Sequence, residues 1–116
     1  MRYMLLIYDA ESQWNSMSEQ ERGQLYHEYM TFTDGLKKSG HHLAGDPLQP
    51  IATATTVRVR NGKPTTMDGP FAETKEQLGG YYIINASNLD EARGIAARVP
   101  SARFGSIEVR PIMEVG

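Results

Sequence analysis

The side chains best suited to chemistry lie in one short segment, Asp68 to Glu76. It holds three carboxylates, on Asp68, Glu73 and Glu76, and the ammonium group of Lys75. Carboxylates held together in a partly dehydrated cleft repel one another, which raises the pKa of one of them into the range of a general base. We predict that Asp68 is this base, that Lys75 stabilises an enolate or carboxylate, and that Glu73, Glu76 and Phe71 bind the ligand.

The same segment also has a purely structural interpretation. Asp68-Gly69-Pro70 is a turn sequence, in which the aspartate accepts hydrogen bonds from the amides that follow and the proline fixes the backbone. Asp68 then only holds the turn, and Phe71 fills the core rather than contacting a ligand. The charged residues after it form a solvated loop or an ion pair between subunits. Composition does not decide between the two interpretations.

Histidines offer a second source of acid and base. His27 lies beside the apolar stripe of a predicted helix and carries an imidazole, the side chain suited to proton transfer near neutral pH, although a lone helical histidine is more often a surface residue. His41 and His42 are neighbours at the start of a predicted strand and point to opposite faces, so they cannot readily bind one metal together. No metal site is predicted. The chain also has no G-x-G-x-x-G or Walker pattern, which disfavours a nucleotide cofactor.

Tyr81 and Tyr82 follow two glycines in a run rich in strand-forming residues. As neighbours in a strand they point to opposite faces. One is expected in the core, and the other is expected to line a ligand cleft or a subunit interface.

The elements that position these residues follow from periodicity and caps. Ser18 and Glu21 form a capping-box pattern, and an apolar stripe follows it in a helix that ends near Gly40. Asn61-Gly62 predicts a tight hairpin between residues 55–60 and 63–67. Further strands are predicted at 3–8, 80–85 and 106–114, and a second helix begins at Ser87 or Asn88 and is ended by Pro100. Leu89, Ala92, Ile95, Ala96 and Val99 are its predicted buried face.

This order predicts a ferredoxin-like α+β domain over residues 1–116, with two helices on one face of an antiparallel sheet and an inserted hairpin. The other face of the sheet would expose apolar side chains, and we expect Tyr3, Leu5, Tyr81 and Ile83 to be among them. Large exposed apolar patches are uncommon on soluble monomers. A homodimer that pairs two such faces is therefore predicted.

Composition excludes several classes of partner. The net charge is −2 and the 12 basic residues are scattered, which argues against nucleic acid. No apolar run approaches the ~20 residues of a membrane span, and the short apolar start lacks the features of a signal peptide. With no cysteine there is no disulfide and no thiolate nucleophile. A cytoplasmic protein with a small-molecule ligand is expected.

The run from Asp68 to Tyr82 resembles the signature of the YCII-related proteins, specifically their DGPF branch. The segments 3–8, 53–60 and 105–111 match the same pattern, so the resemblance covers nearly the whole chain. It implies a ferredoxin-like fold of the dimeric α/β-barrel type. It also implies a suspected small-molecule enzyme or a regulatory protein, for some DGPF proteins an associate of extracytoplasmic-function sigma factors.

Shorter YCII-related proteins have been proposed to pair a histidine on the first helix with an aspartate near the last connection. In this chain the matching positions are Tyr29, with His27 two residues earlier, and the region of Pro100, which has no aspartate. Two hypotheses follow. In the first, the chain is a cofactor-free enzyme with Tyr29 or His27 as proton relay. In the second, it is a ligand-binding or regulatory dimer without catalysis.

Overall fold

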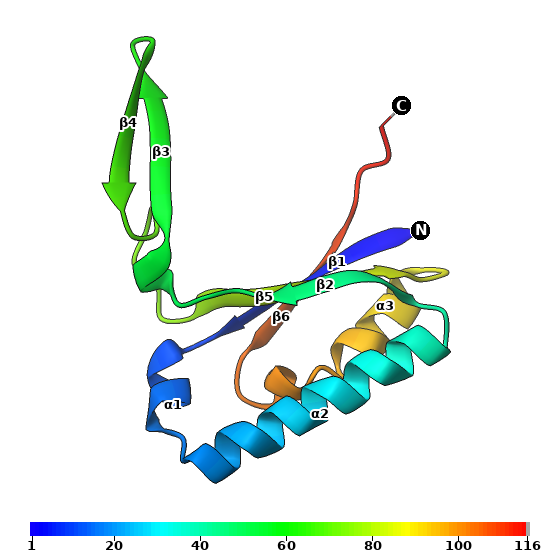
Figure 1. Cartoon of the computed structure of the whole chain (residues 1–116). Helices are drawn as coiled ribbons and strands as arrows, with labels where there is room; N and C mark the ends of the chain where they lie inside the picture. Colours follow the sequence, from blue (N-terminus) through cyan, green and yellow to red (C-terminus); the bar gives the residue numbers. More distant parts are fainter. Residues whose placement is uncertain (116) are drawn as a thin grey trace.

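The computed structural model of the chain describes residues 1–115 and contains a four-stranded antiparallel sheet with two helices on one side (Figure 1). The sheet has the strand order β2-β5-β1-β6. Its strands are β1 (Arg2–Asp9), β2 (His42–Pro47), β5 (Gln77–Asn85) and β6 (Ser106–Pro111). Helix α2 (Glu19–Lys38) connects β1 to β2, and α3 (Leu89–Ala96) connects β5 to β6. This is the predicted ferredoxin-like α+β fold.

Helix α2 begins where its capping box predicts. The Ser18 hydroxyl accepts a hydrogen bond from the Glu21 amide at 3.1 Å, and the Glu21 carboxylate accepts one from the Ser18 amide at 3.0 Å. The helix buries Leu25 and Leu36, with Tyr29 and Phe32 packed at the margin of the core. Its chain then turns at Gly40, whose φ of 81° lies in the left-handed region that favours glycine. No helix of residues 1–115 combines the length and apolarity needed to cross a membrane.

The core lies between the sheet and the helices, and it corrects the predicted facing of β1. Tyr3 is 2% exposed and Leu5 is fully buried, so both point toward the helices and not to the open face. The reason is that apolar residues fill both parities of β1, and the sequence alone could not say which parity faces the helices. The open face instead carries Met4 and Leu6, with Tyr81 and Ile83 of β5 as predicted, all of them partly exposed.

Several element boundaries also differ from prediction. A short helix α1 (Glu11–Ser16) replaces the expected polar connection, β5 begins at Gln77 instead of residue 80, and β6 ends at Pro111 instead of residue 114. On α3, Leu89 is 47% exposed and does not belong to the buried face, because the Asn88 cap places it in the first turn at the edge of the core. The turns η1 (Ile51–Thr53) and η2 (Pro100–Arg103) complete the chain.

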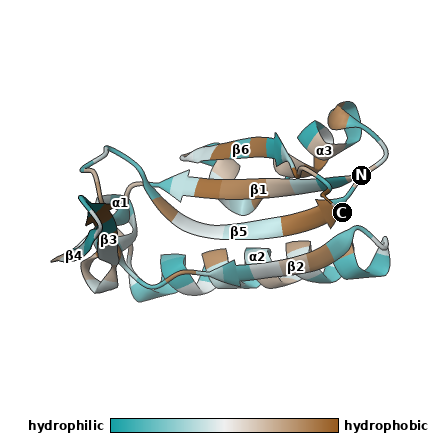
Figure 2. Cartoon of the chain, turned by 90° about the horizontal axis from the view of Figure 1, so that it is seen from above, coloured by the Kyte–Doolittle hydropathy of each residue, from teal (hydrophilic) through white to brown (hydrophobic). Residues whose placement is uncertain are grey.

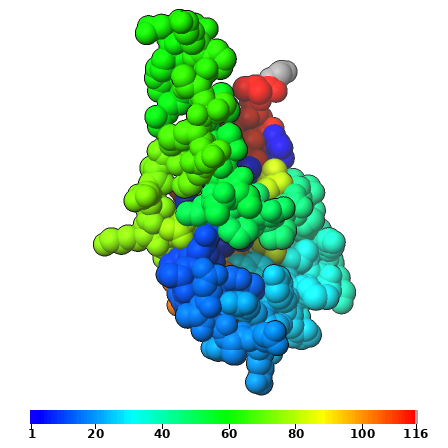
Figure 3. All heavy atoms as spheres, turned by 60° about the vertical axis from the view of Figure 1, so that its left-hand side comes forward, coloured from blue at the N-terminus to red at the C-terminus, as the bar shows by residue number. Residues whose placement is uncertain are grey.

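The hairpin forms a separate two-stranded sheet of β3 (Thr55–Arg60) and β4 (Lys63–Asp68). Asn61 and Gly62 both have positive φ, at 53° and 75°, as the predicted turn requires. The hairpin rises away from the helices, on the side of the open sheet face (Figure 1). Seen as spheres, it is a column that projects from the body of the molecule (Figure 3).

Candidate functional site

Three strand ends bring a cluster of polar side chains together at one end of the sheet. Asp9 ends β1, and it is paired with Gln77 at the start of β5. Glu76 precedes that strand and accepts a hydrogen bond from the hydroxyl of Ser106, the first residue of β6, at 2.8 Å. Glu76 also acts electrostatically on Asp9, which places the two carboxylates in one site.

Asp9 has the properties of a proton-transfer group. Burial raises its pKa above the ordinary value of 3.8 because a carboxylate loses hydration there, while hydrogen bonding to Ser101 opposes the rise. Glu76 and Glu11 raise the pKa further through their negative charges. The residue is still partly exposed, so a ligand can reach it. A raised carboxyl pKa beside an accessible surface is typical of general acids and bases.

A partly buried pair of hydroxyl groups lies near this carboxylate. The Tyr29 and Ser101 hydroxyl oxygens are 2.5 Å apart, and Ser101 is only 1% exposed. Burial raises the pKa of Tyr29 to about 12, the Ser101 hydrogen bond lowers it in part, and Asp9 raises it. Tyr29 is therefore a neutral hydrogen-bonding group at neutral pH.

Close backbone packing fixes these groups. Gly105 lies where an added Cβ would fall 2.2 Å from the Tyr8 carbonyl oxygen and 3.0 Å from the Asp9 Cβ. The Gly105 amide donates to the Ser101 carbonyl at 2.7 Å. A side chain at Gly105 would thus displace the end of β1, so the close approach of the η2 turn to Asp9 depends on glycine.

The first turn of α1 is tied to the same end of the sheet. The Glu11 amide donates to the Gln77 side chain at 2.9 Å, and the Glu11 carboxylate accepts from the Ile51 amide at 2.9 Å. These bonds connect α1, β5 and η1. They hold the negative charge of Glu11 near Asp9.

The predicted base lies elsewhere. Asp68 is exposed at the base of the hairpin, where Gly69 donates to the Ala54 carbonyl at 2.7 Å and Thr56 donates to the Gly69 carbonyl at 2.9 Å. Lys75 is also exposed. These surroundings are those of a turn, and the catalytic role of Asp68 and Lys75 stays a prediction from the sequence.

The other residues of the predicted segment separate. Phe71 is 72% exposed, so it neither fills the core nor lies in a described cavity, and Glu73 is exposed beside it. Glu76 alone joins the Asp9 cluster. Of the predicted site residues, the structure thus brings Glu76 and Tyr29 to the same end of the sheet, both through Asp9.

The tyrosine pair divides between the two sheet faces as predicted. Tyr82 is 7% exposed, packs edge-on against Phe32 with ring centroids 5.3 Å apart, and shares a hydrogen bond of 2.7 Å with Thr33. Tyr81 lies on the open face and donates to Asp46 at 2.8 Å. Tyr82 is therefore a core residue, and only Tyr81 is available to a partner or ligand.

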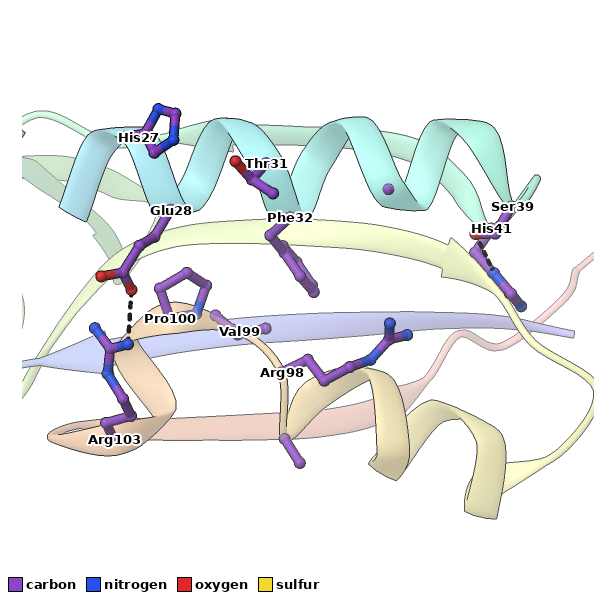
Figure 4. Close-up of a pocket in the computed structure, with 12 residues that line it drawn as sticks. His27, Glu28, Thr31, Phe32, Ser39, His41, Arg98, Val99, Pro100 and Arg103 are labelled. Atoms are coloured by element: carbon purple, nitrogen blue, oxygen red, sulfur yellow. Dashed lines mark hydrogen bonds and ion pairs between the residues drawn. The ribbon is translucent and has the colours of Figure 1, made fainter. Parts of the chain in front are cut away.

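His27 lines a groove between α2 and the segment from α3 to η2 (Figure 4). The groove has a volume of about 710 Å³, and Phe32, Val99 and Pro100 supply its apolar surface. An ion pair of 2.7 Å between Glu28 and Arg103 crosses one end. A smaller cavity adjoins the other end, where His41 contacts Ser39 and Glu91.

Among residues 1–115 there is no cluster of three His, Asp or Glu side chains that could hold a metal ion. Sequence reasoning missed Asp9 and Ser101. The available signal for Asp9 was its place as the first acidic residue after an apolar strand, at a sheet end. Nothing in the sequence distinguished Ser101 from other serines near a helix end.

The comparisons with known proteins agree with this architecture. The chain is 37% identical over 114 residues to the uncharacterized protein R00369 of Rhizobium meliloti (strain 1021), covering 97% of this chain and 92% of that protein. Its structure is similar to that of 5-chloro-2-hydroxyhydroquinone dehydrochlorinase (TftG) from Burkholderia phenoliruptrix AC1100, solved in complex with 2,5-dihydroxybenzoquinone. The TM-score is 0.56 at 17% identity, over 99% of this chain and 96% of that one, a likeness of fold. The family model of the YCII-related domain matches residues 1–116, and the chain therefore belongs to the YCII-related family.

Proposed function

We propose that this protein is a small-molecule enzyme that transfers protons with its own side chains, with Asp9 as the principal acid or base. The observation that carries the proposal is a half-buried carboxylate of raised pKa that is hydrogen-bonded to the buried Ser101, whose hydroxyl in turn pairs with that of Tyr29. This assigns to Asp9 the role that the sequence suggested for Asp68. Tyr29 keeps its predicted role as relay.

The hydrogen-bond chemistry gives the relay a direction. An ionised carboxylate can only accept hydrogen bonds, so the Ser101 hydroxyl donates to Asp9 and is left to accept from Tyr29. When Asp9 takes a proton from a substrate, it becomes a donor and the order can reverse. Ser101 and Tyr29 thus adjust to both protonation states of Asp9 without moving a heavy atom.

The charge of the site favours a neutral substrate. Asp9, Glu76 and Glu11 are all acidic, and their negative charges would repel an anionic ligand. A hydroxylated aromatic ring fits, because its hydroxyl is neutral until a base removes the proton. The likeness of fold to a dehydrochlorinase of a chlorinated hydroxyhydroquinone supports trying this class first.

The test is a panel of hydroxylated and chlorinated hydroquinones, including 5-chloro-2-hydroxyhydroquinone and 2,5-dihydroxybenzoquinone, assayed for binding by thermal shift and for turnover by absorbance and chloride release. A ligand that binds only the native state raises Tm by mass action. Turnover is expected in the wild type, with a loss of at least ~100-fold in Asp9→Asn, the usual contribution of a general acid or base.

Asp68→Asn is the matched control, since it makes the same chemical change on the exposed hairpin. It should leave turnover unchanged. If Asp68→Asn loses activity while Asp9→Asn keeps it, the assignment to Asp9 is wrong and the sequence-based one is restored.

The groove of Figure 4 favours a second candidate, a ligand-binding or regulatory protein without catalysis. Its lining includes two arginines, Arg98 and Arg103, of which Arg103 already pairs with Glu28. An anionic aromatic compound could lie on the apolar surface with its charge on Arg98. Under this alternative, Arg98→Ala abolishes the thermal shift, Asp9→Asn leaves it intact, and no compound is turned over. An association with a sigma factor remains a prediction from the resemblance.

A further inference from the structure

The β3–β4 hairpin lacks the packing that normally stabilises such an element. All of its strand residues except Thr56 are exposed, and Val57 and Val59 keep 60% and 59% of their surface accessible. An isolated two-stranded hairpin is at best marginally stable in water. The structure therefore presents an ordered arm whose apolar side chains have no partner within residues 1–115.

The two faces of this arm differ in chemistry. Val57 lies opposite Thr66, and Val59 lies opposite Pro64, so alternation gathers these four side chains on one uncharged face. The other face carries the basic side chains Arg58, Arg60 and Lys63.

The arm adjoins a second surface that is also uncovered. Figure 2 looks down onto the open face of the main sheet, from the side on which the arm rises. Met4, Leu6 and Tyr8 of β1 and Tyr81 and Ile83 of β5 lie on this face and are partly exposed. The arm rises from the same side of the sheet as this open face (Figure 1).

The charges indicate which partner fits. The arm, residues 55–68, contains three basic residues and Asp68, a net charge of +2, whereas the whole chain has −2; the rest of the chain therefore has −4. A basic arm is attracted to an acidic body, and the body of a second copy of this chain is acidic. Such charge complementarity favours and orients association.

We propose that the β3–β4 arm clasps a second copy of this chain when the open sheet faces of the two copies pack about a two-fold axis. In a two-fold symmetric interface both copies make the same contacts, so the arm of each copy packs against the body of the other. The uncharged face of the arm meets the partner, and the net positive charge of the arm is attracted to the partner's net negative body. This inference does not depend on the proposed enzymatic function.

The arm can be shortened to its first strand pair, with the loss of one hydrogen bond at its base, from Thr56 to the Gly69 carbonyl. Thr55 and Asp68 are paired opposite each other, so replacing residues 56–67 with Asn-Gly should close a minimal turn. We expect the full chain to be a dimer by analytical ultracentrifugation at micromolar concentration, and the shortened chain to dimerise at least ~10-fold more weakly, a difference of about 1.4 kcal/mol. Circular dichroism should show that the shortened body remains folded.

Paired point variants separate the two faces of the arm. Val57→Ser with Val59→Ser removes apolar contact and should weaken the dimer at all salt concentrations. Arg58→Ser with Arg60→Ser removes charge and should weaken it only at low salt, where attraction between exposed charges is unscreened.

A full chain that stays monomeric would overturn the proposal, as would a shortened chain with an unchanged dissociation constant. Binding of a monomeric full chain to anionic vesicles or to nucleic acid would assign the arm to another partner and overturn it too. Because the readout is association, failure here leaves the activity test of Asp9 unaffected, and the reverse also holds.

Discussion

Asp9 illustrates how a single residue can combine a functional advantage with a cost in stability. Burial and neighbouring carboxylates disfavour its ionised form in the folded state, and that raises its pKa. Sites of this kind are often destabilising, because the protein maintains a strained or unfavourable group for its chemistry. The same cost is measurable without knowing the substrate.

We predict that Asp9→Asn raises the stability of the protein at pH 7. Because the folded-state pKa lies above the ordinary value of 3.8, the folded state binds more protons than the unfolded state between these two values. The free energy of unfolding of the wild type therefore falls as pH rises through this window. The asparagine variant lacks that pH dependence. Its free energy of unfolding at pH 7 should exceed that of the wild type by less than about 1 kcal/mol, because Asp9 is partly exposed.

Urea denaturation at pH 3 and pH 7 measures this difference, which should shrink at the lower pH. Asp68→Asn, on the exposed hairpin, should change stability by less than about 0.5 kcal/mol at either pH. A larger loss of stability at pH 7 in Asp9→Asn would show that the ionised carboxylate is favoured in the fold.

The Tyr29–Ser101 pair predicts strong coupling between two substitutions. Tyr29→Phe leaves the fully buried Ser101 hydroxyl without this partner, at a cost of about 1–3 kcal/mol. Ser101→Ala likewise leaves the Tyr29 hydroxyl without its hydrogen-bond partner. In the double variant both polar groups are gone, so the loss should be smaller than the sum of the two single losses, and additive losses would contradict the pairing.

At the residue scale, the site predicted from the sequence and the proposed site differ in how far apart their residues lie along the chain. The predicted site has three carboxylates within residues 68–76, whereas the proposed site joins residues that are distant in the sequence: Asp9, Tyr29, Glu76 and Ser101. A turn can be predicted from neighbouring residues, as from Asp68-Gly69-Pro70. The register of β1 with β5 and β6 cannot be predicted in this way, although it determines which side chains come into contact.

At the scale of elements, predictions with a local physical cause were confirmed. The capping box begins α2, the Asn61-Gly62 turn closes the hairpin, and Asn88 accepts a hydrogen bond from Glu91 at the start of α3. Predictions that required knowledge of packing were wrong, as for the facing of Tyr3 and Leu5. The hydrogen bonds of caps and turns form between residues close in the sequence. Which side of a strand faces the core depends on elements that are distant in the sequence.

The same substitution should have opposite effects in two elements. Gly105→Ala places a methyl group 2.2 Å from the Tyr8 carbonyl and should destabilise the protein by about 1–3 kcal/mol, with displacement of Asp9. Gly94→Ala, in α3 with open space around the new methyl group, should stabilise it by about 0.5–1 kcal/mol. Thermal denaturation of both variants tests this pair, and a tolerated Gly105→Ala would mean that the η2 turn does not constrain β1.

At the scale of the whole molecule, the helices cover one face of the sheet and leave the other beside a projecting arm (Figures 1 and 3). The fold could be predicted from the order of elements, because few arrangements accommodate two β-α-β halves. The upright position of the arm could not, since it depends on the chain leaving the main sheet after β2 and returning only at β5.

The proposed assembly predicts that thermal stability depends on protein concentration. Association that requires the folded state raises Tm as concentration rises. We expect Tm to increase between 1 and 100 μM for the full chain, two orders of magnitude in concentration, and to change much less for the chain with the shortened arm. If Tm rises equally with concentration in the two proteins, the arm does not contribute to the folded dimer.

The paired strands of the hairpin also restrict how its length can vary among related proteins. Adding one residue to each strand lengthens it by about 3.4 Å but reverses the side to which every later side chain points. Adding two residues to each strand extends its reach and keeps valines and arginines on their own sides. Insertions and deletions in this hairpin should therefore come in multiples of four residues, a periodicity that the exposed turn at Asn61-Gly62 would not impose by itself.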